Sequence, residues 1–388
     1  MLFDEIVKSS YSGPEYPVLG AFSREWAFSR PFEGLRVLAA TPVFRNTLLQ
    51  YRALLAGGAN LVVGIAGSGK DCAGADAAGA AMPCDLGIVD VLRENGIPVI
   101  GVQEALEMEA RCADSGDSAF DLILDCAGQF SACHPRFGFV ELTRSGVQFY
   151  ENCEHPVYVA DSGIVKRIET CLGTGEGYVR ALAQLGHDFD DGKKFVVFGS
   201  GKVGQGIVLQ LLRSGANVQV VTDCSRGSNA FLDANDVPVT DCNDLDGVAA
   251  LVRDADFVVT ATGVKGALDR PQIVEALLAS GAVLANMGVE DEYGPGIPAT
   301  RVLAEKKPLN FILEEPTHLK YIDASLALHA ALGELLLQEG GAVYGKEGAG
   351  ANKNAGPQDP PSELEQRILS MTMQDGLIGA EIAEMMGW

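Results

Sequence analysis

The stretch that decides the fold reads KKFVVFGSGKVGQGIVLQLLRSGANVQVVTD and runs from Lys193 to Asp223. It begins with a short apolar run, Phe195–Phe198, which is long enough for a strand that is buried on both faces. Apolar side chains then recur at helical spacing over Val203–Leu212, and a second apolar run ends at Asp223. The order of strand, helix and strand predicts a βαβ unit in a parallel sheet.

Three glycines stand where this strand meets its helix, in the pattern G-x-G-x-x-G: Gly199, Gly201 and Gly204. The first allows a tight turn, the second lets the backbone approach a pyrophosphate, and the third lets the helix pack closely with its N-terminus toward the anion. Asp223 follows Gly201 by 22 residues, where a carboxylate takes ribose hydroxyls and repels a 2′-phosphate. The pattern predicts NAD as the cofactor. Arg226 leaves NADP as a minor alternative, and a glycine-rich turn that binds no cofactor is the other.

Composition excludes several classes of partner. A chain of 388 residues favours two domains, and its net charge of −23 repels phosphate backbones, so we expect neither nucleic acid nor an anionic membrane as a partner. No apolar run reaches transmembrane length, and the first five residues have no signal-peptide character, which favours a cytoplasmic protein. Nine cysteines without a C-x-x-C pair predict free, mostly buried thiols, and five scattered histidines predict no metal site.

Strand and helix patterns alternate over residues 37–124 and again over residues 195–286. The alternation predicts an α/β protein of two doubly wound, Rossmann-like domains with parallel sheets, joined by hinge helices. We expect a substrate-binding domain over 1–165, completed by returning C-terminal helices over 318–388, and an NAD-binding domain over 166–317. Glycines at 173, 175 and 177 predict a break in the hinge helix, and the polar stretch 345–361 predicts an exposed loop.

A second glycine-rich segment, Gly64–Lys70, fits the P-loop pattern G-x-x-x-x-G-K. Asp71 follows it in place of the serine or threonine that would hold magnesium, and alanine-glycine repeats replace a helix start. We therefore interpret this segment as a flexible loop over the cleft between the domains and not as a nucleoside triphosphate site.

Four residues are candidates for the chemistry of a hydride-transfer site, which needs a general base and a fixed nicotinamide. His318 precedes a helix and is expected to face the cleft; capping or burial is the alternative. Lys166 and Glu169 lie on one helical turn that looks exposed, so a solvated ion pair is the alternative to a catalytic role. Asp125 ends a strand at the ligand-binding edge, or else caps the following turn.

Further candidates surround the expected cofactor. Glu141 is a candidate substrate contact, His329 is expected to pack in the interior, and Cys126 to be a small buried residue. The predicted cofactor contacts are those of the glycine turn and its helix start, those at the ends of the later strands, and one turn in the first domain: Gly199, Gly201, Lys202, Val203, Gly204, Asp223, Thr260, Thr262, Gly263, Asn286 and Thr143.

The order of these motifs resembles the adenosylhomocysteinase (S-adenosylhomocysteine hydrolase) superfamily over roughly residues 25–370. Leu309-Asn310 with His318 is similar to the family's returning strand, whose histidine faces a nucleoside. The resemblance implies a substrate domain, a domain with tightly held NAD, and tetramers that exchange C-terminal tails. It rests on six segments of this sequence: Ile123–Gly128, Glu141–Val147, Val159–Ser162, Gly199–Gly206, Thr260–Gly263 and Asn286–Gly288.

Several positions depart from the family's pattern. The family oxidises a ribose 3′-hydroxyl, eliminates homocysteine, adds water and reduces the ketone, with a lysine, carboxylates and histidines around the sugar. The family's lysine falls on Val165, one residue before Lys166, and one residue turns a helical side chain by about 100°. Its carboxylate falls on Glu169. The tail's Lys and Tyr have no clear counterpart, and other family side chains fall on Pro42, Cys126, Thr174 and Val289.

Together these observations predict an NAD-dependent oxidoreductase of the adenosylhomocysteinase-like group that lacks several of the family's catalytic residues. Its expected substrate is a secondary alcohol of a nucleoside- or sugar-like small molecule. Two alternatives stay open: a hydrolase or lyase that runs the oxidation–elimination–reduction cycle on a thioether nucleoside, and a non-catalytic NAD-binding subunit. We expect a homodimer or homotetramer.

Overall fold

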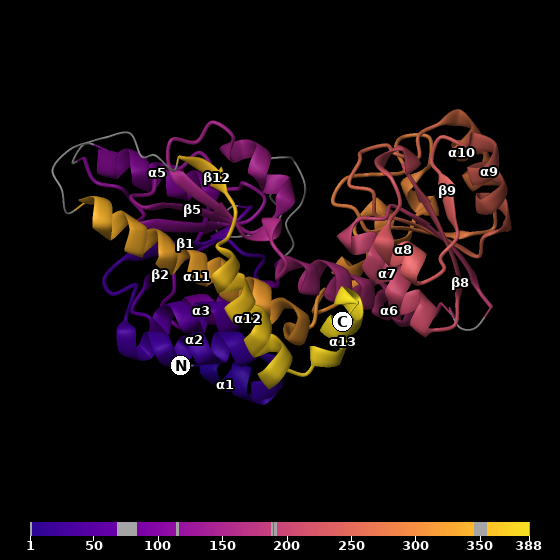
Figure 1. Cartoon of the computed structure of the whole chain (residues 1–388). Helices are drawn as coiled ribbons and strands as arrows, with labels where there is room; N and C mark the ends of the chain where they lie inside the picture. Colours follow the sequence, from indigo (N-terminus) through magenta and orange to yellow (C-terminus); the bar gives the residue numbers. More distant parts are fainter. Residues whose placement is uncertain are drawn as a thin grey trace. The chain divides into compact units, whose positions relative to one another are not determined.

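The computed structural model describes residues 2–67, 84–113, 116–187, 189, 192–344 and 355–387. The chain forms two compact units: unit 1 is Met1–Ile168 with Leu319–Trp388, and unit 2 is Glu169–His318 (Figure 1). Part of the P-loop-like segment, residues 68–70, lies outside the described residues, as do residues 345–354 of the polar stretch.

Unit 2 is built on a five-stranded parallel sheet in the order β11-β10-β7-β8-β9. The chain runs outward from β7 through β8 to β9 and then returns to the other side of β7, so β7 and β10 form the switch point at which such sheets bind ligands. The strands are β7 (Lys194–Phe198), β8 (Asn217–Thr222), β9 (Val239–Asp241), β10 (Phe257–Thr260) and β11 (Val283–Asn286).

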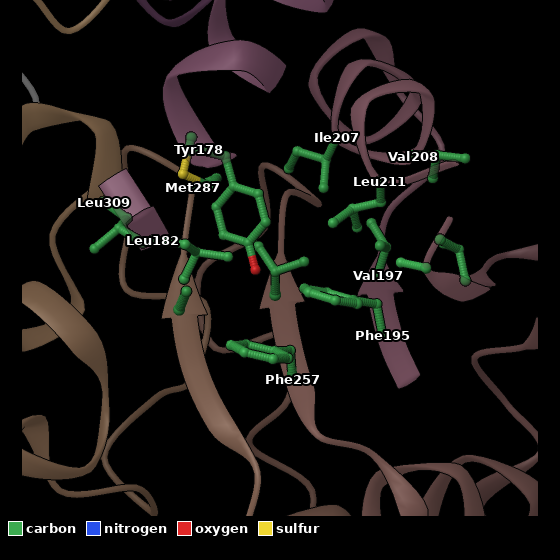
Figure 2. Packing of buried hydrophobic residues seen from close by; sticks show 14 of the residues in the cluster. Tyr178, Leu182, Phe195, Val197, Ile207, Val208, Leu211, Phe257, Met287 and Leu309 are labelled. Atoms are coloured by element: carbon green, nitrogen blue, oxygen red, sulfur yellow. The ribbon is translucent and has the colours of Figure 1, made fainter. Parts of the chain in front are cut away.

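Both faces of this sheet are buried, which explains the unbroken apolar runs in the sequence. On one face, Phe195 and Val197 pack with side chains of α6 and α7, among them Tyr178, Leu182 and Ile207 (Figure 2). The alternate strand residues face a second core formed with α9 and α10. The helices are α6 (Thr174–Gln184), α7 (Lys202–Arg213), α8 (Ala230–Ala234), α9 (Leu245–Asp254) and α10 (Pro271–Ala279).

The glycine-rich segment before this sheet is helical, so the predicted break is wrong. A π-helical turn, η4 (Ile168–Gly173), runs directly into α6. The glycines serve packing: a Cβ atom on Gly175 would collide with Gly206 of α7, and one on Gly206 would collide with the backbone of Cys171. Small residues here let α6 lie close against α7. The expected returning strand at Leu309 is also wrong, because this segment is a 3₁₀ turn, η8 (Leu309–Ile312).

Unit 1 contains a seven-stranded parallel sheet in the order β12-β6-β5-β4-β1-β2-β3. Together the two parallel sheets with their helices confirm the predicted α/β, Rossmann-like class. The strands are β1 (Arg36–Ala39), β2 (Asn60–Ile65), β3 (Val99–Gly101), β4 (Leu122–Asp125), β5 (Gly138–Glu141), β6 (Pro156–Val159) and β12 (Gly356–Gln358). The edge strand β12 falls inside the stretch expected to be a loop, which corrects that expectation for residues 356–358.

The long helix α11 (Leu319–Tyr344) crosses unit 1 and contacts β4 and β5 as well as α2, α3 and α12 (Figure 1). Asp323 of α11 accepts hydrogen bonds from the amides of Val18 and Leu19, at 2.9 and 3.0 Å, and thereby caps the first turn of α2. The remaining helices of the unit are α1 (Leu2–Ser10), α2 (Pro17–Ser29), α3 (Leu48–Ala56), α4 (Leu86–Glu94), α5 (Val102–Ala113), α12 (Ser362–Asp375) and α13 (Gly379–Met386).

The cysteines only partly match the expectation of buried free thiols. Cys126, Cys133 and Cys171 are buried and free, whereas Cys224 is free but exposed. Cys84 is disulfide-bonded, which corrects the prediction that every thiol is free.

Candidate functional site

The glycine turn between β7 and α7 is shaped to admit a ligand at one position only. Gly199 has φ of +107°, a conformation that side chains with a Cβ rarely adopt, and a Cβ on Gly204 would collide with the carbonyl of Gly199. A Cβ on Gly201, in contrast, would meet nothing within 4 Å. The backbone at Gly201 is therefore open, while the turn around it is tightly packed.

Side chains brace this turn from two directions. The carbonyl of Ser200 accepts hydrogen bonds from Gln205 Nε2 at 2.9 Å and from Asn229 Nδ2 at 3.0 Å. The hydroxyl of Ser200 lies 2.9 Å from that of Thr222, at the end of β8. The turn is thus held in one conformation before any ligand arrives.

These residues fit a dinucleotide. The first backbone amides of α7, from Lys202 and Val203 onward, stand at a helix N-terminus, where orphan N–H groups and the helix dipole favour an anion. Asp223 follows β8, is half-buried, and accepts hydrogen bonds from the amide and hydroxyl of Ser225 at 3.0 and 2.6 Å. Those bonds fix the carboxylate at the end of the strand next to the glycine turn.

The turn after β10 is organised by a carboxylate that sequence reasoning missed. Glu292 is fully buried and accepts hydrogen bonds from Thr262 N, Thr262 Oγ1 and Gly263 N at 2.8, 2.8 and 2.7 Å. Burial raises its pKa, against the opposing effect of these hydrogen bonds. The only sequence signal was an acidic residue in a loop near the carboxyl ends of the strands, which is too common to select it.

Asn286 and Thr260 form a buried link between β10 and β11. Thr260 Oγ1 donates to Asn286 Oδ1 at 2.8 Å, and the Asn286 amide nitrogen contacts the carbonyls of Gly288, Glu290 and Lys306 at 3.0, 2.9 and 2.6 Å. These bonds tie together the loops at the carboxyl edge of the sheet. Both side chains therefore act through the shape of the edge.

His318 is paired with a carboxylate. Its Nδ1 lies 3.1 Å from Oε1 of Glu176 on α6, while Arg180 Nε donates to both carboxylate oxygens of Glu176 at 2.9 and 2.8 Å. Arg180 also donates to the carbonyl of Glu315 at 3.0 Å. Burial acts to raise the pKa of Glu176, but the bonds from His318 and Arg180 outweigh it and hold the pKa below its usual value. Glu176 was not predicted, because nothing local distinguishes it.

Lys166 and Glu169 do not share an exposed turn as expected. Lys166 is buried, with 3% of its surface exposed, and Glu169 is half-buried. The charge of Lys166 acts together with burial, the larger effect, to lower the pKa of His329 to about 4. Lys166 thus belongs to the polar interior of unit 1.

His329 is buried, as predicted, and is held by hydrogen bonds. Gln50 Nε2 lies 3.1 Å from His329 Nδ1, and His329 Nε2 lies 2.9 Å from the carbonyl of Val140. A carbonyl only accepts, so Nε2 carries the proton and Nδ1 accepts from Gln50. Thr41 in turn donates to Gln50 Oε1 at 3.1 Å. The histidine is a neutral member of an ordered chain.

Asp125 and Glu141 end neighbouring strands and hold the loop between them. Asp125 accepts from Phe130 N at 2.9 Å and from the Tyr150 hydroxyl at 2.5 Å. Glu141 accepts from Ala127 N at 2.9 Å, and from Thr143 N and Oγ1 at 2.7 and 2.6 Å. Burial raises the pKa of both carboxyl groups, and their proximity adds to the effect for Asp125.

These contacts favour the alternative that Asp125 holds the following turn. Thr143 is engaged by Glu141 in the same way, and Cys126 is buried as expected. Within the described ranges, no group of three or more His, Cys, Asp or Glu residues is arranged to hold a metal ion. No helix in those ranges is long and apolar enough to cross a membrane.

A family model described as "Putative NAD(P)-binding" matches residues 187–287, the segment that carries the glycine turn and all five strands of unit 2. Unit 2 is therefore an NAD(P)-binding domain of the Rossmann type, which confirms the predicted class of cofactor.

Curated relatives cover most of the chain. An adenosylhomocysteinase from Thermoplasma acidophilum is 26% identical over 73% of this chain and 68% of its own length. One from Sulfurisphaera tokodaii is 26% identical over 70% of this chain, a match that spans 64% of the relative's length. An S-inosyl-L-homocysteine hydrolase from Methanopyrus kandleri is 24% identical over 95% of this chain and 89% of its own length. The chain is a divergent adenosylhomocysteinase-like protein.

Solved structures with a similar fold include a dipicolinate synthase component from Bacillus halodurans, with 14% identity, a TM-score of 0.46, and coverage of 79% of this chain and 98% of that one. A transhydrogenase from Sinorhizobium meliloti has 14% identity and a TM-score of 0.41, with coverage of 79% and 94%.

Proposed function

We propose that the protein is an NAD-dependent oxidoreductase that acts on a secondary alcohol of a nucleoside- or sugar-like small molecule. The observation that carries the proposal is the glycine turn of unit 2, which is open at Gly201 and packed at Gly199 and Gly204. Gly201, Lys202 and Val203 would hold the pyrophosphate, and Asp223 would take the ribose hydroxyls and favour NAD over NADP.

NAD, when bound, supplies the acceptor for the hydride of the alcohol. The chain must then supply a base for the hydroxyl proton. His318 is suited to this role because Glu176 only accepts hydrogen bonds, so Nδ1 carries the proton and Nε2 is left with a lone pair. Such a base contributes roughly 10²–10⁴-fold to the rate.

The other predicted residues support this site in different ways. Glu292 and Asn286 shape the carboxyl edge of the unit 2 sheet through Thr260, Thr262 and Gly263. In unit 1 we assign Asp125 and Thr143 to positioning, because their side chains are engaged by the loop that follows β4 and by Glu141. Lys166 and Glu169 are kept as candidate contacts to substrate, and unit 1 as the substrate-binding part of the chain.

A hydrolase or lyase that acts on a thioether nucleoside is the second candidate, because the curated relatives are named as hydrolases of this kind. Against it, the family's lysine and two of its histidines fall on Val165, near Pro42 and on Val289 in this chain, none of which transfers a proton. We place the protein in the cytoplasm as a homodimer or homotetramer.

Two measurements test the proposal. The first is mass spectrometry of any nucleotide released when the purified protein is denatured, together with calorimetric titration with NAD and NADP. The second is NADH formation with a panel of nucleosides and sugar alcohols, in parallel with a thiol assay on thioether nucleosides. We expect NAD binding and alcohol-dependent NADH formation that His318→Gln abolishes without loss of NAD affinity.

The other outcomes separate the alternatives. Thiol release would favour the hydrolase, and NAD binding without any turnover would favour a non-catalytic NAD-binding protein. Absence of affinity for either dinucleotide in the purified protein would overturn the proposal.

A further inference from the structure

A cavity of about 580 Å³ lies among the N-terminal helices of unit 1, within the size range of small-molecule sites. Its walls come from η1 (Gly13–Glu15), α2 and α3, with Asp375 at the end of α12. No residue of its lining belongs to the cofactor-binding unit. The cavity therefore calls for an explanation that is independent of NAD.

Arg52 of α3 lines this cavity with an unmatched donor. Its Nε lies 3.6 Å from Asp4 Oδ1, but its Nη1 is buried and has no hydrogen-bond partner among the described residues. A buried cationic donor without an acceptor costs about 1–3 kcal/mol or more, so native proteins rarely leave one unmatched. A ligand that brings an acceptor to Nη1 removes this cost.

Arg24 of α2 supplies a second guanidinium group, which is exposed and has no ion-pair partner among the described residues. It shares one face of α2 with Tyr16 and Gly20, since the three positions are four residues apart. A Cβ on Gly20 would lie 3.3 Å from the Tyr16 ring and 3.6 Å from Arg24 Nη1. The missing side chain at Gly20 thus leaves the ring and the guanidinium facing the same space.

The charge of the lining is opposite to that of the whole chain. The cavity wall carries two arginines and one carboxylate, Asp375, whereas the protein has a net charge of −23. The N-terminus of α2 is not the source of attraction, because Asp323 already caps the amides of Val18 and Leu19. The guanidinium groups remain as the recognition elements, and guanidinium matches carboxylate and phosphate oxygens bidentately.

We infer that this cavity binds a small organic oxyanion, a phosphate ester or a carboxylate, between Arg24 and Arg52 and beside the Tyr16 ring. The size of the cavity admits more than an inorganic ion, and the ring offers an apolar face to the rest of the ligand. Asp375 at the wall disfavours polyanions and restricts the site to ligands of low charge.

The test is calorimetric titration and thermal unfolding of the full chain with inorganic phosphate and, separately, malonate, at ionic strength held constant with sodium chloride. We expect at least one anion to bind and to raise the unfolding temperature. Arg24→Gln should weaken binding about tenfold or more, as loss of a charge-assisted contact implies. Arg52→Gln should do the same.

Arg111→Gln is the matched control, because Arg111 is exposed on α5 and pairs with Glu107 away from the cavity. Arg24 is exposed, so its variant keeps the test informative should the Arg52 variant fail to fold. The relative affinities of phosphate and malonate identify which oxyanion the site prefers. Equal stabilisation of the wild type and both cavity variants, or no binding of either probe, would overturn the inference, whatever the outcome of the NAD titrations.

Discussion

The Nδ1 atom of His318 lies 3.1 Å from Oε1 of Glu176, and Arg180 holds that carboxylate through both of its oxygens. The arrangement fixes which nitrogen of the imidazole carries the proton. It joins the residue that precedes α11 to the first turn of α6, a relationship that only the fold establishes.

Loss of the Glu176 carboxylate should change the tautomer of His318. With Glu176→Ala, the acceptor for Nδ1–H disappears, so we expect the ring to shift toward the form protonated on Nε2. Ring ¹⁵N NMR measures this directly, with His318→Gln to assign the resonances and exposed Glu275→Gln as the control. An unchanged ring spectrum in Glu176→Ala would show that the pair does not set the tautomer. NADH formation should fall together with the tautomer shift.

Two glycines of the β7–α7 turn should respond differently to alanine. A Cβ on Gly204 collides with the backbone, so Gly204→Ala should destabilise the protein by about 1–3 kcal/mol or more. A Cβ on Gly201 enters open space, so Gly201→Ala should fold normally, within about 0.5 kcal/mol, yet bind NAD about tenfold or more weakly. Chemical denaturation and calorimetry separate the two effects. Gly281→Ala, also in open space but at another loop of unit 2, should change neither quantity.

Replacement of Asp223 should weaken NAD binding and narrow the preference over NADP. The carboxylate is the only group we assign to the ribose, and without it a 2′-phosphate is no longer repelled. We expect Asp223→Ala to lose about tenfold in NAD affinity, with a smaller loss for NADP. Because Asp223 also holds Ser225, the variant Ser225→Ala is the control for loop effects alone. A constant ratio of the two dissociation constants would contradict the assigned role.

Local patterns were enough to predict the elements with strong periodicity. The runs at Phe257–Thr260 and Val283–Asn286 were placed with their observed bounds, and so was the helix Leu86–Glu94. In each case the apolar residues alone define a buried face, so no distant partner is needed. The edge strand β12 was missed because it contains Pro357 and pairs only with β6, where Gly356 N bonds to the carbonyl of His155.

The partners of the site residues depend on the tertiary fold. Glu292 lies 30 positions from Thr262, and Glu176 lies far along the chain from His318, yet each pair is in direct contact. The segment from Glu169 to Gly177 was misread because its glycines resemble a helix break, while their function is close packing against Gly206. Burial of Lys166 was missed for the same reason: a charged side chain in a short segment gives no sign of what surrounds it.

Two buried groups on α11 should give unfolding stability opposite dependences on pH. Burial raises the pKa of Asp323 from 3.8 to about 7, so the folded protein holds more protons than the unfolded chain across that window, and this contribution to the free energy of unfolding is lost as pH rises through it. Burial lowers the pKa of His329 from 6.5 to about 4, so its contribution is present above 6.5 and is lost as pH falls through that window.

Relative to wild type, Asp323→Asn should therefore gain stability as pH rises from about 4 to about 7, and His329→Gln should gain as pH falls from about 6.5 to about 4. Each pKa unit corresponds to about 1.4 kcal/mol, so the changes amount to a few kcal/mol at most. Urea denaturation across this range measures them, and Lys320→Gln, a more exposed position on the same helix, serves as the control. Because both carboxylate oxygens of Asp323 cap α2, its asparagine variant should start from a lower stability and approach the wild type only toward neutral pH. Parallel pH profiles for the two variants would show that neither group is perturbed in the folded state.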